Sequence, residues 1–151
     1  MNLQMEINSL KQRITELEQQ AKREQEFPGH CDDYWFLSGG GTIDDSFYTD
    51  SHVDNKRLGM GNMFETRQQA QFALEKLKVE AELRKFSRPF ENGKFNHYIF
   101  FYVDGNYIEV GYKNAYHSQG AIYFESEDKA QQAIQSVGEN RIKKYIFGVE
   151  D

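Results

Sequence analysis

Cysteine, proline and long apolar runs are scarce in this chain. Its 151 residues include one cysteine and two prolines. The single cysteine, Cys31, excludes a disulfide within the chain and fits a reducing compartment. No apolar run approaches the roughly 18 residues that a membrane span needs, and the polar N-terminus has no signal-peptide core. We therefore expect a soluble protein of the cytoplasm.

The chain also lacks a net positive charge: 24 Asp and Glu outnumber 18 Lys and Arg, and the formal net charge is −6. Affinity for phosphate comes from Lys and Arg that displace counterions, so direct binding of nucleic acid is not expected. Aromatic residues, in contrast, make up 15% of the chain, with 12 Phe and 9 Tyr. This is enough apolar material for a packed core.

Apolar residues near the N-terminus alternate spacings of three and four, which is the period of about 3.5 residues found in coiled coils. β-Branched residues at heptad position a with Leu at position d favour two parallel strands. The a positions are Ile7, Ile14 and Ala21, and the d positions are Leu3, Leu10 and Leu17.

Charges beside this stripe agree with parallel pairing. Glu6 at position g faces Lys11 at the following e position of a second helix, and Arg13 likewise faces Glu18. We predict that residues 1–26 form an oligomerisation helix that makes a parallel homodimer. The alternative is a surface helix that lies on its own domain.

The remainder of the chain predicts a duplicated α+β domain after a hinge at residues 27–33. The domain covers residues 34–151, with repeated units at about 34–88 and 95–147. We expect each unit to be a β-hairpin or meander followed by a helix, and the two units to form one compact domain by pairing strands or stacking helices.

The repeat is clearest where each helix begins. Phe64-Glu65-Thr66 and Phe124-Glu125-Ser126 are 60 residues apart, and each precedes a helical pattern. Thr66 and Ser126 are suited to cap a helix, and Gln69 completes a capping box in the first copy. The first helix is predicted at 67–86, and Gly138 is predicted to divide the second. Tight turns are expected at 39–41 and 104–106.

No stretch has the pattern of a catalytic or metal site. Gly39-Gly40-Gly41 is followed by a strand pattern, so a turn is favoured over a phosphate-binding loop. The four aspartates between residues 44 and 54 are expected in a solvated acidic loop, because the spacing of an EF-hand is missing. Cys31 stands beside His30, but adjacency in sequence does not supply a catalytic base. We therefore predict no enzyme activity, no cofactor and no metal.

Aromatic residues lie on both faces of the strand predicted at 97–103. Such residues suit a core or a protein contact.

Several segments of the chain, with the leading coiled coil, resemble small uncharacterised proteins of phages and prophages from Gram-positive bacteria. These segments are 61–66, 70–78, 123–126 and 143–148. That resemblance implies a bacterial host cell and inhibition of a host protein, such as an anti-CRISPR or other anti-defence activity.

The leading hypothesis is therefore a non-enzymatic protein that binds and inhibits a host protein, possible targets being a CRISPR nuclease or another defence component. One alternative is a binder, or sponge, of a small nucleotide signal. Another is a structural or DNA-associated phage protein. The residues predicted to contact the partner are Trp35, Asp44, Asp45, Asp50, Asp54, Tyr112 and Tyr116.

Overall fold

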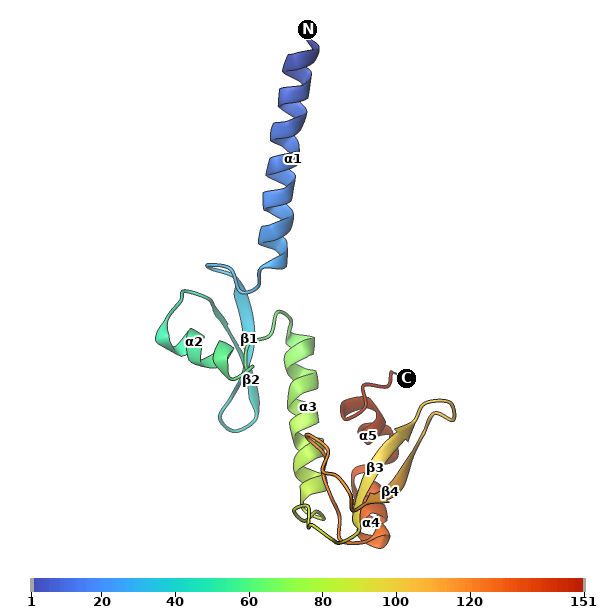
Figure 1. Ribbon diagram of the computed structural model, residues 1–151. Coiled ribbons are helices and arrows are strands. Elements are labelled where there is room, and N and C mark those ends of the chain that lie inside the picture. The colour runs from blue at the N-terminus through green and yellow to red at the C-terminus, as the bar shows by residue number, and fades with distance from the viewer. Residues whose placement is uncertain (1, 151) are drawn as a thin grey trace. The chain divides into compact units, whose positions relative to one another are not determined.

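The computed structural model describes residues 2–150, apart from the side chains of residues 23–25. Helices and antiparallel hairpins follow one another along the chain (Figure 1), which confirms the α+β class and the long N-terminal helix. The elements are α1 Leu3–Gln25, β1 Asp33–Ser38, β2 Thr42–Phe47, α2 His52–Gly59, α3 Arg67–Arg84, β3 Asn96–Tyr102, β4 Tyr107–Lys113, α4 Glu127–Val137 and α5 Glu139–Tyr145.

The chain divides into two compact units, Met1–Gln71 and Phe72–Asp151, where one compact domain was expected from residue 34 onward. The boundary falls within α3, because Val79 and Leu83 pack into the same core as Phe124. Most of α3 therefore belongs to the second unit. The strands form two separate two-stranded sheets, so strand pairing, one of the two expected ways of joining the repeats, is wrong. The duplication itself stays a prediction.

The first unit contains the β1–β2 hairpin, in which the register runs from Asp33 opposite Phe47 to Ser38 opposite Thr42. Gly40 and Gly41 have positive φ angles and make the turn between the strands, as predicted. The glycine run therefore joins two strands and opens no helix.

Strand β2 and the first turn of α2 together replace much of the expected acidic loop. Asp44 and Asp45 lie on β2, which pairs with β1, and Asp54 lies in the first turn of α2. The side chain of Ser51 accepts from the backbone N–H of Asp54 at 3.1 Å, and Asp54 accepts in return from the backbone of Ser51. This capping box ends the loop at Ser51.

Asp54 is also the centre of a buried hydrogen-bond network. Its side chain is only 3% exposed and accepts from the hydroxyl of Tyr34 at 2.6 Å and from the backbone N–H of Thr49 at 2.9 Å. These bonds hold the pKa of the Asp54 carboxyl well below its usual range, and the bond from Tyr34 has the largest effect. The Tyr34 hydroxyl in turn accepts from Arg57, whose guanidinium lies 3.6 Å from the centre of the Phe36 ring.

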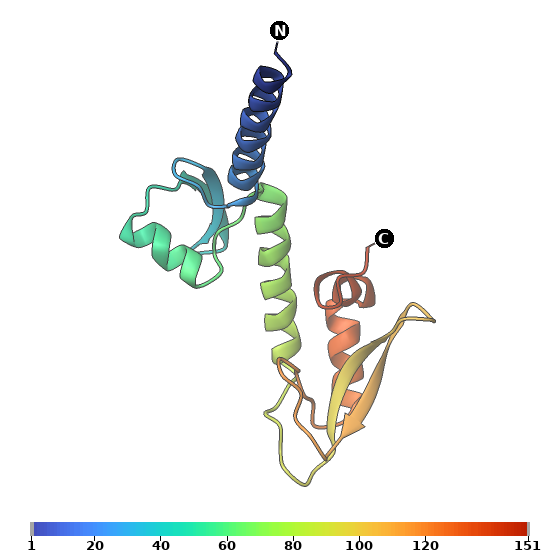
Figure 2. The same ribbon diagram turned by 45° about the horizontal axis from the view of Figure 1, so that its top comes forward.

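The second unit packs α4 and α5 against the β3–β4 hairpin (Figure 2). The hairpin turns at residues 103–106, and Gly138, with φ of 101°, separates the two helices, as predicted. Ile146 and Phe147 border the core at its edge. The core residues are Val79, Leu83, Phe124, Ala130, Ala133, Val137 and Ile142.

Both units share a local arrangement at the start of their helices. The phenylalanine before the cap forms a two-way backbone bridge with a hairpin strand, Phe64 with Trp35 and Phe124 with His97. Thr66 and Gln69 make the predicted capping box, and Ser126 caps α4. These bridges tie the start of α3 to the first hairpin and the start of α4 to the second.

Asp54→Asn is expected to make the first unit less stable at pH 7, because an amide cannot accept all the bonds that the carboxylate accepts. A carboxyl whose pKa is lowered by folding stabilises the fold above its ordinary pKa of about 3.9, and this contribution is lost as the pH falls below that value. Urea unfolding followed by the fluorescence of Trp35, the single tryptophan, measures the effect. The difference in the free energy of unfolding between wild type and variant should become smaller from pH 7 to pH 3. A difference that does not change with pH would contradict this role of Asp54.

Candidate functional site

The apolar stripe of α1 is exposed along its whole length. Every described side chain from Leu3 to Lys22 is exposed, and Leu10 is 63% exposed. A helix of 23 residues is about 35 Å long, and most of a helix's stability in a protein comes from packing of its apolar face. The single chain buries none of the heptad leucines and isoleucines, which makes the stripe the leading candidate for an interface. Its members are Leu3, Ile7, Leu10, Ile14, Leu17 and Ala21.

The charges that flank the stripe are available for pairing between helices. Within the described residues, Glu6, Lys11 and Glu18 have no ion pair. Arg13 pairs with Glu16 on its own helix at 3.4 Å, but both side chains are more than half exposed. An exposed pair of this kind contributes little, so Arg13 can exchange Glu16 for a carboxylate on a second helix.

The register of the first hairpin brings two of the predicted contact residues together. Trp35 lies opposite Asp45, so both side chains are on one face of the β1–β2 hairpin. The Trp35 ring is half-buried, and the Arg67 guanidinium lies 5.7 Å from its centre. Asp44 lies opposite Phe36 and is therefore on the other face.

The other aspartates are not part of this face. Asp54 is buried and bonded within the first unit, so it is not available to a partner. Asp50 is exposed in the loop before α2, where its carboxylate accepts from Asn55 at 2.9 Å and from Tyr48 at 3.2 Å. The four aspartates are thus placed by three different elements. Among the side chains that the structure describes, no three from His, Cys, Asp or Glu lie where they could share a metal ion.

Sequence reasoning missed three apolar neighbours of Trp35. Leu37, Ile43 and Phe47 lie on the same face as Asp33, Trp35 and Asp45, and we call this set the Trp35 face. Phe47 is 56% exposed, and Leu37 and Ile43 are half-buried. The alternation of apolar and polar residues on each strand is a signal that could have identified them, once the turn at the glycines fixed the register.

The remaining predicted residues, Tyr112 and Tyr116, belong to the second unit and are exposed. The Tyr112 ring meets that of Phe95 edge-on at 5.1 Å. The amine of Lys113 lies 4.7 Å from the centre of the Tyr116 ring and 4.3 Å from that of Tyr98. The contact with Lys113 holds the Tyr116 ring within the second unit, in addition to the partner contact predicted for Tyr116.

Cys31 is exposed and has a positive φ angle of 66°. Its sulfur lies 3.2 Å from Nδ1 of His30. Both side chains lie in the segment between α1 and β1, where each is exposed. The pair has none of the burial that holds a nucleophile and its base in a fixed geometry.

Comparison of the chain with protein-family models, with curated proteins and with solved structures finds no significant match. The resemblance to phage proteins therefore stays a prediction. Among the described residues, none of the helices has the length and apolar character needed to cross a membrane.

Replacing Ile7, Leu10 and Ile14 together with Gln is expected to convert a dimer into a folded monomer. Gln keeps the helix propensity but removes the apolar groups that a second helix would cover. Light scattering should give half the mass of the wild type. Circular dichroism should show that the variant is still folded. Met5→Gln is the matched control, because Met5 is also 63% exposed but lies outside the stripe. A triple variant that stays dimeric would place the interface elsewhere.

Proposed function

We propose that this protein is a parallel homodimer that binds and inhibits a macromolecular partner without itself being an enzyme. The observation that supports dimerisation is the exposed stripe of α1, with complementary charges beside it. Two copies of the helix would cover each other's Ile and Leu side chains. The dimer would then carry two copies of the hairpin of the first unit and two of the second unit, which raises the effective concentration for a partner with repeated sites.

The Trp35 face is the contact surface that we propose for the partner. It combines a tryptophan and an exposed phenylalanine with the carboxylates of Asp33 and Asp45. Aromatic side chains dominate the binding energy of protein interfaces, and carboxylates favour a basic surface opposite them. With the net charge of −6, this chemistry favours a basic, partly apolar protein surface as the partner.

The more specific proposal, inhibition of a host defence protein such as a CRISPR nuclease, depends on the resemblance to phage proteins. It predicts that a purified nuclease complex loses cleavage when the protein is added in molar excess. Unimpaired cleavage across several nuclease types would remove this version and leave the binding proposal in place.

A nucleotide ligand receives less support. The second unit has a hollow lined partly by Arg88 and Lys94, which a phosphate could use. The Arg88 guanidinium, however, already donates to Asn96 and to the backbone oxygens of Pro89 and Phe95. The Lys94 amine pairs with Glu91 at 3.2 Å. Both cations of this hollow are therefore already engaged by groups of the chain.

Asp45→Arg is expected to abolish capture of a partner from bacterial lysate by the immobilised protein, because it reverses the charge of the Trp35 face. Asp44→Arg makes the same change one residue away on the opposite face and should retain capture. Mass spectrometry of the bound proteins compares the variants, and circular dichroism checks that both are folded.

Two outcomes would count against this assignment. Equal capture by wild type and Asp45→Arg would show that the Trp35 face is not the contact surface. A wild-type protein that enriches nothing over uncoated resin would contradict the binding proposal itself.

A further inference from the structure

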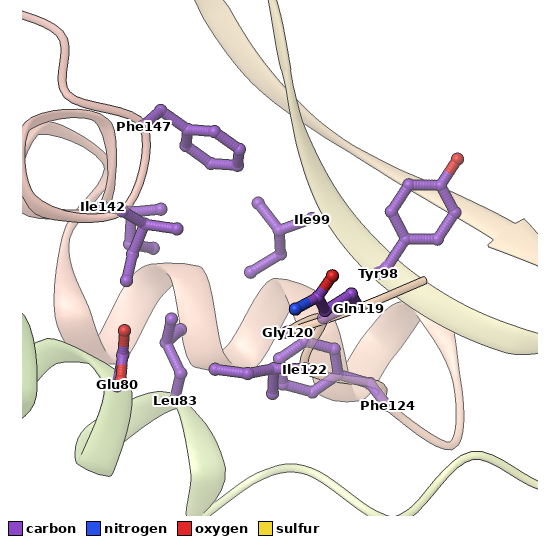
Figure 3. A pocket seen from close by; sticks show the side chains of 12 residues that line it. Glu80, Leu83, Tyr98, Ile99, Gln119, Gly120, Ile122, Phe124, Ile142 and Phe147 are labelled. Atoms are coloured by element: carbon purple, nitrogen blue, oxygen red, sulfur yellow. The ribbon is translucent and has the colours of Figure 1, made fainter. Parts of the chain in front are cut away.

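A hollow of about 220 Å³ opens within the second unit (Figure 3). Its walls come from α3, β3, the segment between β4 and α4, and the C-terminal end of α5 with the residues that follow. Most of the lining is apolar: Leu83, Ile99, Ile122, Phe124, Ile142 and Phe147. The hollow is complete within one unit.

Glu80 is the charged residue in the lining. Its side chain is half-buried and has no hydrogen bond or ion pair among the residues that the structure describes. Lys and Arg do not occur among the lining residues. A carboxylate at the edge of an apolar hollow whose lining holds no cation favours a positively charged ligand group beside it.

A second polar group projects from the opposite wall. The amide of Gln119 points into the hollow beside Ile99 and Ile122 (Figure 3). Gln119 is followed by Gly120, whose φ of 71° turns the chain at this wall. Ser118, the residue before Gln119, accepts a hydrogen bond from the amine of Lys113 at 2.5 Å. This bond ties the segment to β4.

We propose that this hollow binds a small organic cation with a flat apolar body. An apolar cavity of about 150 Å³ holds benzene, so a hollow of about 220 Å³ has room for a fused pair of rings. The rings would lie against Ile99, Phe124 and Phe147, and an ammonium group would face the carboxylate of Glu80. Gln119 supplies a hydrogen bond at the other wall. Anions are disfavoured, since the carboxylate has no compensating cation among the lining residues.

Tryptamine is a suitable probe, because it joins an indole ring to a primary ammonium. Indole-3-propionate has the same ring and a similar chain, but a negative charge. Isothermal titration of the full chain should show saturable binding of tryptamine and none of the anion. Glu80→Gln should weaken tryptamine binding about tenfold, because it removes a charged hydrogen-bond acceptor.

Glu109→Gln is the matched control. It removes the same charge from the same unit at an exposed position of β4 outside the lining, and should leave tryptamine binding unchanged. Ala121→Leu adds bulk to the wall of the hollow and should remove binding of the ring itself. Circular dichroism checks the fold of each variant, and Glu80→Gln alone decides the assignment if Ala121→Leu fails to fold.

Three results would overturn the proposal. The first is equal affinity for tryptamine and the anion, and the second is equal weakening by Glu80→Gln and Glu109→Gln. The third is the absence of binding at millimolar tryptamine. None of these results bears on dimerisation through α1, which light scattering of the same samples measures separately.

Discussion

The exposed apolar stripe of α1 is the constraint on which this account depends. Burying apolar surface is the main favourable term in folding, and a side chain the size of Leu or Ile contributes about 1.5–3 kcal/mol when it is fully buried. The described part of α1 gains none of this free energy of burial within one chain, because every side chain from Leu3 to Lys22 is exposed. A second copy supplies a complementary surface, since the stripe is its own partner in a parallel pair.

The rest of the first unit and the second unit have their own means of stability. In the first, the Asp54 carboxylate joins a hairpin strand to α2 through Tyr34. In the second, apolar residues from α3, α4 and α5 make one core. In both, a two-way backbone bridge and a capped helix start connect helix and hairpin. Because neither core includes a described residue of α1, the helix can be changed for an experiment without emptying either core.

Local signals in the sequence predicted much of this fold. The heptad spacing, the caps at Thr66 and Ser126, and the interruption at Gly138 each depend on residues within a few positions of one another. Helix α2 was missed, although Ser51 and Asp54 have the spacing of a capping box. Its aspartate was assigned to solvent because burial of a carboxylate depends on a donor 20 residues away, the Tyr34 hydroxyl.

The candidate site was harder to predict than the fold. Trp35 and Asp45 share a face only through the register of the hairpin, which separates Asp45 from its neighbour Asp44. The assignment of most of α3 to the second unit depends on the packing of Val79 and Leu83, and spacing along the chain does not reveal that choice. The hollow beside Glu80 draws on segments from Glu80 to Phe147, so no single motif announces it.

A disulfide between two copies of α1 tests the central claim most directly. Leu3→Cys in a Cys31→Ser background leaves one thiol per chain, at a d position near the N-terminus. In a parallel pair the two thiols meet, and mild oxidation should give a covalent dimer on a non-reducing gel. Gln12→Cys at an outward position should stay monomeric on the same gel. If Leu3→Cys forms no more covalent dimer than Gln12→Cys, the helices do not pair in parallel and the account is contradicted.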